Sequence, residues 1–147
     1  MILKPENPLF DTRIREMLSR QAFMNHLGFE ITRIEAGIVE GEMAFMPHLF
    51  QQFGILHGGV DLTVADIVAG FAVYTLVPEN NDVVTAEIKV SCLRPGRGDR
   101  IRAVGKVLKP GKSLTFAEAE VFCIREGKEF LIAKASTTMA VIEPLKP

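Results

Sequence analysis

The sequence has little that would tie it to nucleic acid, to a membrane or to secretion. Its formal net charge is −1, whereas nucleic-acid-binding domains usually carry an excess of lysine and arginine. The N-terminus has no apolar stretch beyond its first three residues, so no secretory signal is expected. The longest apolar run, Val60 to Val77, contains Asp61 and Asp66, which a membrane span would not accommodate cheaply. We therefore expect a cytoplasmic protein with no nucleic-acid or membrane partner.

Cysteine is also scarce. Two cysteines are too few for a disulfide framework, and they lack metal-ligand spacing. Cys92 and Cys123 both fall in apolar, strand-like stretches, which predicts free, buried thiols. His26 and His48 have no ligand spacing with any Cys, Asp or Glu, so no metal site is expected. With 48% apolar residues and no repeat or linker, residues 1–147 should form a single domain.

The order of apolar patterns predicts an α+β domain. One helix is expected from about Pro8 to His26, capped by Asn7 and ended by Gly28. A long apolar helix should begin near His57, and it needs cover on most sides, which a curved antiparallel sheet would provide. The expected strands, two before that helix and four after it, are 29–35, 38–46, 84–92, 100–108, 114–124 and 129–142.

The first of the four later strands alternates regularly. Apolar side chains at Val84, Ala86, Ile88, Val90 and Cys92 are separated by polar ones. This period of two indicates a strand with one buried face, formed by the apolar set.

The chemistry-bearing segment begins with His57, Gly58 and Gly59, where a loop enters the long helix. Backbone N–H groups at a helix start have no partners within the helix. Glycines let a substrate approach those groups closely. The segment could therefore hold a carbonyl oxygen and stabilise an oxyanion. Taken alone, the motif is weak, because such glycines more often mark only a tight turn.

Asp66 is the second candidate, because it lies in an otherwise apolar stretch of the same helix. Burying an unpaired carboxylate costs several kcal/mol, and the small residues Ala69 and Gly70 leave room beside it. It could form the wall of a prepared pocket or lie on the one wet stripe of the helix, and both interpretations stay open. Asp61 lies about 140° around the helix axis from Asp66. It is near the helix N-terminus, where the dipole favours an acid, so no carboxylate pair is expected.

The spaced motif, Gln51-x-Phe-Gly-Ile-Leu-His57-Gly58-Gly59 with Asp66 nine residues after the histidine, resembles the hotdog thioesterases of the phenylacetic-acid pathway. The resemblance extends from about residue 20 to residue 142. It implies a hotdog fold with its core over about 28–142 and hydrolysis of an acyl-CoA thioester. It also implies a homodimer, with pairs of dimers compatible with the family.

The resemblance further implies a role for each matching residue. Asp66 would attack the thioester carbon or activate water, and the Gly58 N–H would bind the thioester oxygen. Gln51 would place the water, and Thr85 would contribute a hydroxyl. The site would be completed across the dimer interface, with no cofactor beyond the substrate's own coenzyme A. Gln51 is similar to the branch that handles aromatic acyl groups, whereas Asp66 with Thr85 is similar to the medium- and long-chain branch, so the acyl group is left open.

Basic residues gather between Arg94 and Lys112, where seven lysines and arginines accompany one acid, Asp99. Arg94, Arg97 and Lys112 lie at expected turns and could meet the phosphates of coenzyme A. Ser113 could touch the pantetheine arm or could simply be a turn serine. For Arg102 and Lys106 a solvated strand face is the favoured interpretation.

His57 could act as an acid or could hold its loop by hydrogen bonds. We favour the structural role, because no Asp or Glu lies at a triad position beside it. Two other functions remain open. A hotdog hydratase or dehydratase would need a His–Asp pattern that is not found, and a non-catalytic acyl-CoA-binding module would bind substrate without turnover.

Overall fold

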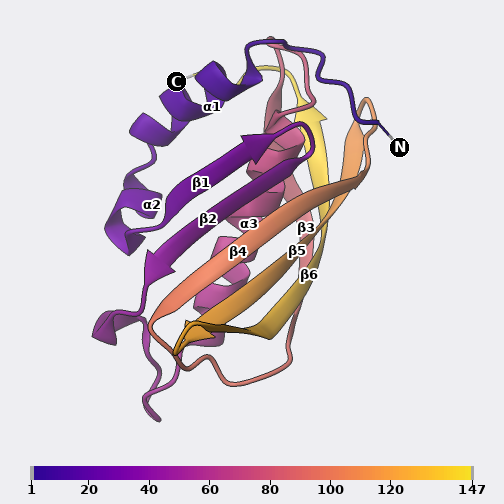
Figure 1. Ribbon diagram of the computed structural model, residues 1–147. Coiled ribbons are helices and arrows are strands. Elements are labelled where there is room, and N and C mark those ends of the chain that lie inside the picture. Colours follow the sequence, from indigo (N-terminus) through magenta and orange to yellow (C-terminus); the bar gives the residue numbers. More distant parts are fainter. Residues whose placement is uncertain (1, 147) are drawn as a thin grey trace.

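The computed structural model of the protein describes residues 2–146. It contains one six-stranded antiparallel sheet with the strand order β1-β2-β4-β5-β6-β3. The sheet curves around the long helix α3 (Figure 1). The elements are α1 (Phe10–Ser19), α2 (Ala22–Leu27), β1 (Glu30–Glu35), β2 (Ile38–Ala44), a 3-10 turn (Pro47–Leu49), α3 (Gly58–Tyr74), β3 (Asp82–Cys92), β4 (Arg100–Lys109), β5 (Leu114–Arg125) and β6 (Lys128–Ile142).

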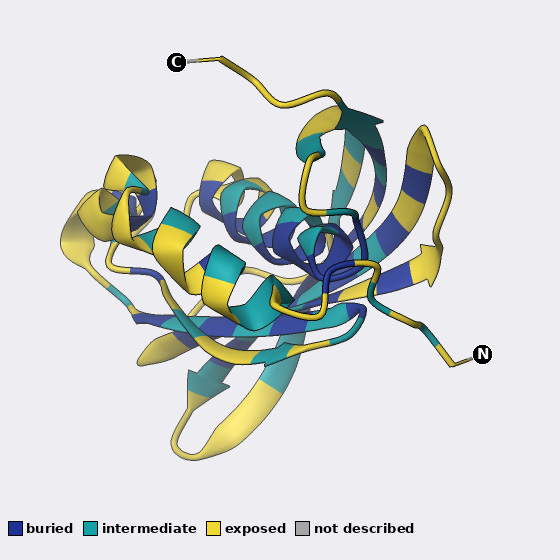
Figure 2. Cartoon of the chain, turned by 90° about the horizontal axis from the view of Figure 1, so that it is seen from above, coloured by how far each residue is buried: buried dark blue, intermediate teal, exposed yellow. Residues whose placement is uncertain are grey.

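The α+β class and the hotdog architecture expected from the sequence are confirmed. The side of α3 that meets the sheet is buried, with Val64, Ala65 and Val68 fully covered (Figure 2). Burial of this kind, at about 25 cal/mol per Å² of apolar surface, is what stabilises the helix in its sheet. Among residues 2–146, no helix has the length and apolarity that crossing a membrane requires.

One glycine fixes how closely α3 lies against the sheet. A Cβ atom added to Gly105 of β4 would lie 2.3 Å from the backbone oxygen of Val68 in α3. No side chain fits at that distance, so the helix and the strand are in direct backbone contact there. The position of every functional group on α3 depends on this contact.

The N-terminal region differs from the single helix expected over about residues 8–26, which was wrong. Two helices, α1 and α2, are separated at Arg20 and Gln21, because Gln21 has a non-helical backbone (φ −80°, ψ 82°). Met24 of α2 enters the core with 3% exposure. Gly28 ends α2 in the left-handed conformation (φ 74°), as its position predicted.

The strand β3 also departs from the simple alternation. A bulge between Thr85 and Glu87 shifts its pairing with β6, and a bulge reverses the face to which the following side chains point. Thr85 consequently faces α3, where it bonds to Asp66, whereas Val84 is exposed. The expected buried face was therefore wrong: Val84 and Ala86 are exposed, and Ile88 and Val90 are only half-buried. The expected burial of both thiols was also wrong, because Cys123 is buried but Cys92 is exposed.

Candidate active site

The start of α3 is organised by His57, the residue that caps the helix. Its Nδ1 atom accepts a hydrogen bond from the Gly59 N–H at 2.8 Å, and its carbonyl oxygen accepts from the Val60 N–H at 2.8 Å. His57 thus has the structural position favoured from the sequence, and the Gly59 N–H is already occupied. The Gly58 N–H has no acceptor among residues 2–146. It is exposed at the positive end of the helix dipole, where it can bind an oxyanion.

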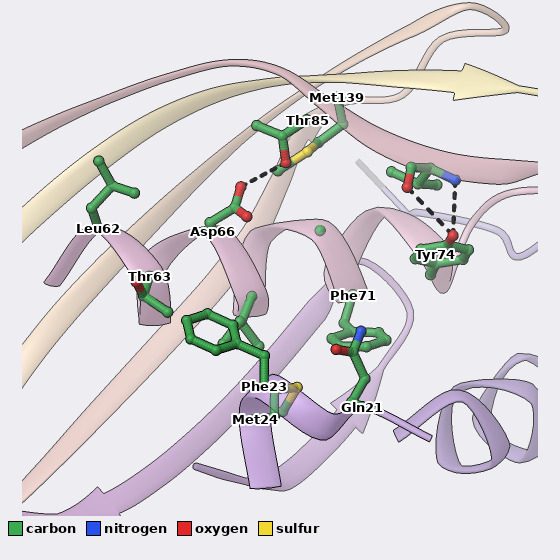
Figure 3. A pocket seen from close by; sticks show the side chains of 13 residues that line it. Gln21, Phe23, Met24, Leu62, Thr63, Asp66, Phe71, Tyr74, Thr85 and Met139 are labelled. Carbon is green, nitrogen blue, oxygen red and sulfur yellow. Dashed lines mark hydrogen bonds between the residues drawn. The ribbon is translucent and has the colours of Figure 1, made fainter. Parts of the chain in front are cut away.

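Asp66 lies two turns further along α3, in a hollow between the helix and β3. Its Oδ1 atom accepts a hydrogen bond of 2.7 Å from the Thr85 hydroxyl (Figure 3). The carboxylate is half-buried, so it combines the two interpretations left open by the sequence. It forms a pocket wall and still reaches solvent. Thr85 engages Oδ1, whereas Oδ2 has no hydrogen-bond partner among residues 2–146.

The hollow around Asp66 has a volume of about 410 Å³. Leu62, Asp66 and Gly70 recur every four residues and therefore share one face of α3. Gly70 lines the hollow, as expected, but Ala69 is in the core. The lining comes from α3, β3, β6 and the α2 region and is mostly apolar: Gln21, Phe23, Met24, Leu62, Thr63, Asp66, Ile67, Gly70, Phe71, Tyr74, Val83, Thr85 and Met139.

Tyr74 closes the end of the hollow that is farthest from the start of α3. Its hydroxyl accepts a hydrogen bond of 3.0 Å from the Val83 N–H, which ties the end of α3 to the start of β3. Burial is the main cause that raises the pKa of Tyr74. The phenol therefore stays neutral and serves as a fixed polar contact in an apolar wall.

Asp61 lies in the first turn of α3, as the sequence predicted, but its side chain is buried. It is 3% exposed, and its Oδ1 atom has no hydrogen-bond partner among residues 2–146. Its Oδ2 atom accepts a weak hydrogen bond from the Cys92 thiol at 3.7 Å. Burial raises the pKa of the Asp61 carboxyl to about 6. Asp61 lies on the same helix face as Val64, Ala65 and Val68, which are all core residues.

Asp61 and Cys92 lie directly behind the first glycine of the helix. A Cβ atom at Gly58 would be 3.4 Å from the Cys92 sulfur.

Within residues 2–146 there is no group of three or more His, Cys, Asp or Glu side chains that could hold a metal ion.

Gly58 and Asp66 do not meet within one chain. They are eight residues apart on α3, which corresponds to about 12 Å along the axis. Gln51 is also separate from the hollow. The side-chain oxygen of Gln51 accepts a hydrogen bond from the Phe53 N–H, and the backbone N–H of Gln51 donates to the Ile55 carbonyl at 2.9 Å. A single chain therefore presents the Gly58 N–H and the Asp66 carboxylate at two separate places.

The basic residues fall into three groups. Arg94 and Arg97 flank Gly96, whose carbonyl accepts from the Leu56 N–H at 3.1 Å, so they lie beside the start of α3. Lys112 and Ser113 are in the turn at the opposite end of β4 and β5. One chain thus does not gather the predicted phosphate-binding residues. Arg102 forms ion pairs with Glu40 and Glu129. These pairs are compatible with the solvated strand face favoured for Arg102 from the sequence.

Comparison with known proteins gives consistent matches. The family model of the Thioesterase superfamily matches residues 53–129. The proofreading thioesterase EntH of Klebsiella pneumoniae is 31% identical over 104 residues, which covers 71% of this chain and 76% of that protein. A thioesterase family protein from Silicibacter pomeroyi has a structure with a TM-score of 0.90, 36% identity and coverage of 92% of this chain and 99% of that one.

The structure of the Escherichia coli PaaI protein, from the phenylacetic acid degradation operon, matches with a TM-score of 0.80. Its identity is 20%, and the match covers 90% of this chain and 93% of that one. At this identity the similarity concerns the fold.

Proposed function

Since the chain belongs to the thioesterase superfamily and is a thioester hydrolase, we propose that its substrate is an acyl-CoA thioester and that Asp66 supplies the reacting carboxylate. The observation that carries this proposal is the position of Asp66. It lies in an apolar hollow, held on one oxygen by Thr85 and free on the other. A fixed carboxylate beside an apolar pocket suits attack on an acyl group held in that pocket.

The reaction would proceed by one of two routes. The free oxygen of Asp66 attacks the thioester carbon to form an acyl-enzyme anhydride that water then hydrolyses, or it takes a proton from the water that attacks. In both routes the carbonyl oxygen becomes negative, and the Gly58 N–H binds that charge. The carbon–sulfur bond breaks, coenzyme A leaves as the thiolate, and the free acid follows. The reaction uses no cofactor beyond the substrate's own coenzyme A.

The separation of Gly58 from Asp66 makes a homodimer part of the proposal. Both groups must contact one carbonyl group, and about 12 Å of helix separates them in one chain. β3 pairs with β6 on one side, and its other edge is open among the described residues. Edge strands readily pair with another chain. A partner joined along β3, next to Thr85, would bring its own Gly58 loop and Gln51 toward this Asp66.

A pair of such dimers would be compatible with the outer face of the sheet. Leu108, Leu114 and Phe116 are each close to half exposed there. An exposed apolar cluster of this kind commonly marks a contact between proteins.

The acyl group should be apolar. Phe23, Leu62, Ile67 and Phe71 surround Asp66, and no other charged side chain of residues 2–146 lines the hollow. A hydrocarbon or aryl chain would gain free energy by leaving water there. Within the described part of the chain no histidine lines the hollow, which disfavours a hydratase that works through a His–Asp pair.

The test is thiol release from a panel of aromatic and straight-chain acyl-CoAs by wild type and Asp66→Asn. We expect turnover by the wild type and a fall of at least a thousandfold in kcat for the variant, on the order found when a covalent or basic group is removed. Circular dichroism and sedimentation should show an unchanged fold and assembly. Tight binding of acyl-CoA without turnover would instead indicate a binding module. Activity indifferent to Asp66 would contradict the mechanism.

A further inference from the structure

Three arginines surround a second hollow beside the start of α3. It has a volume of about 270 Å³ and is lined by Arg94, Pro95, Arg97, Cys123, Arg125, Phe130 and Ile132. We propose that this arginine hollow binds the phosphorylated nucleotide end of coenzyme A, with Arg125 as a substrate-binding residue. This inference rests on the proposed function and names the part of the substrate that the hollow holds.

The three guanidinium groups lack acidic partners. None of Arg94, Arg97 and Arg125 forms an ion pair within residues 2–146, whereas Arg33, Arg100 and Arg102 are all paired with glutamates. Unpaired cations around one concave surface repel each other. A bound polyanion would remove that repulsion and form charge-assisted hydrogen bonds, for which arginine is well suited.

Two of the arginines are held in place by other groups. Arg94 donates from Nη1 to the Leu131 carbonyl at 2.9 Å, and Arg125 lies over the Phe130 ring at 5.1 Å. Because these contacts restrict both side chains, less conformational entropy is lost when a ligand binds. The Phe130 ring and Ile132 add an apolar floor, which suits the adenine base beside the phosphates.

The loop from Arg94 to Asp99 brings the arginines together. A Cβ atom at Gly98 would lie 2.4 Å from the Ile124 carbonyl oxygen and 3.5 Å from the Cβ atom of Arg125. Gly98 also has a φ of 155°, which other residues rarely adopt. The loop therefore packs directly on the end of β5, so that Arg97 and Arg125 line the same hollow although they are distant in sequence.

The arginine hollow is connected to the oxyanion donor. A Cβ atom at Gly96 would be 2.7 Å from the Leu56 side chain, and Leu56 precedes His57 and Gly58 by one and two residues. Cys123 and Arg125 lie at alternate positions of β5 and so share the face that Cys123 turns to the core. A thioester with its carbonyl at Gly58 can thus direct its pantetheine arm away from the acyl pocket and toward the arginines.

The shape of the site favours coenzyme A over an acyl carrier protein. An acidic protein surface needs a broad basic face, but these cations surround a small concave space with an apolar floor. A nucleotide with a base and several phosphates matches both features.

The experiment compares two thioesters of one acyl group, the coenzyme A thioester and the N-acetylcysteamine thioester, which lacks the nucleotide. For Arg125→Gln we expect KM for the acyl-CoA to rise about tenfold, the effect of losing one charge-assisted hydrogen bond. The kcat should change little, and the N-acetylcysteamine thioester should be hydrolysed as by the wild type. Arg97→Gln should behave in the same way, and 0.5 M NaCl should raise KM for acyl-CoA alone. Arg15→Gln, an exposed position on α1, is the matched control for lost charge.

Several results would overturn the proposal. An unchanged KM for acyl-CoA in both variants would exclude contact with the nucleotide, and equal losses on both thioesters would indicate a structural role. A selective loss with an acyl carrier protein substrate would assign the arginines to that partner instead. If the wild type hydrolyses no thioester, the proposed function fails, but the hollow is still tested by calorimetry with adenosine 3′,5′-bisphosphate. Binding that Arg125→Gln abolishes would support the hollow, and no binding to the wild type would refute it.

Discussion

The hydroxyl of Thr85 donates a 2.7 Å hydrogen bond to Oδ1 of Asp66, and it can do so only because β3 is bulged next to Thr85. In a regular strand, residues of one parity share a face. The bulge places Thr85 on the same side as Ile88 and Val90, which pack against the core. One irregularity in the sheet thus orients the carboxylate that we propose to be reactive.

Thr85→Val should therefore lower kcat for acyl-CoA by about tenfold, because it removes a hydrogen bond to a charged group while keeping the side-chain shape. Thr85→Ser should retain most of the activity, since it keeps the hydroxyl. Steady-state kinetics of both variants, with urea unfolding as the check on stability, measures the effect. A Val variant with the kcat of the wild type would show that Asp66 needs no such support.

Gly58→Pro should lower kcat by roughly a hundredfold or more, because it removes the N–H that we assign to the oxyanion. The backbone tolerates proline there. Gly58 is the first residue of α3, and His57 before it is extended (φ −67°, ψ 132°), as a residue preceding proline should be. Gly58→Ala adds the same Cβ atom near Cys92 but keeps the N–H, so it is the matched control. Equal losses in the two variants would point to the added atom rather than the N–H.

The Gly58→Pro variant also tests whether the site spans two subunits. Co-expression of Gly58→Pro with Asp66→Asn should restore about a quarter of the wild-type activity, because half of the dimers are mixed and each has one intact site. The separate variants should stay inactive when each is expressed alone. No restoration in mixed dimers, verified by differential tags, would place both groups in the site of one chain.

Gly70→Leu should change which acyl groups are accepted. Around a Cβ atom at this position the nearest group is the Met139 methyl at 3.9 Å, so a larger side chain extends into the hollow beside Asp66. We expect kcat/KM for medium and long acyl chains to fall at least tenfold relative to acetyl-CoA, since one lost methylene of space already costs about 1 kcal/mol. Gly70→Ala should keep the preference of the wild type and gain roughly 0.5–1 kcal/mol of stability as a better helix former. A Leu variant with an unchanged chain-length profile would mean that the acyl group lies elsewhere.

Asp61 makes stability depend on pH in a direction that is unusual for an acid. Its pKa is raised from 3.8 to about 6 in the folded state, so the folded protein binds more protons than the unfolded one between these values. Stability therefore falls as pH rises through this range. Above pH 6 the cost approaches about 3 kcal/mol, at 1.36 kcal/mol for each pKa unit. Asp61→Asn should consequently be more stable than the wild type at pH 8, and the difference should vanish near pH 4.

Urea unfolding of both proteins at the two pH values measures this difference. Glu79→Gln, at an exposed position, controls for the loss of one negative charge. A difference between Asp61→Asn and wild type that is the same at pH 4 and pH 8 would show that the ionisation of Asp61 does not cause it.

Much of the fold could be predicted because turn residues mark its boundaries. Gly28 has a positive φ where the sequence indicated a helix end, and Gly37 has a positive φ in the gap between the first two expected strands. Each expected strand after α3 lies within a few residues of the observed one. These are local signals, which depend on backbone conformations that few residues adopt.

The burial of the two aspartates could not be predicted from such local signals. α3 is apolar on nearly all sides, so its sequence does not reveal which face meets the sheet. In the structure, Asp61 is the buried acid with an unsatisfied oxygen, whereas Asp66 is held by Thr85 at the edge of the hollow. The break at Gln21 and the bulge in β3 were missed because tertiary packing, rather than local preference, determines both.

The backbone contact between Gly105 and Val68 separates the positions that can vary from the one that cannot. Any side chain at residue 105 would lift α3 off the sheet and displace Gly58 and Asp66 together. Residues 62, 67 and 70 face the hollow from the opposite side of the helix, and they can change without altering that contact. A lineage of such enzymes could thus diverge in acyl preference through the exposed side of the helix, while residue 105 remains glycine throughout.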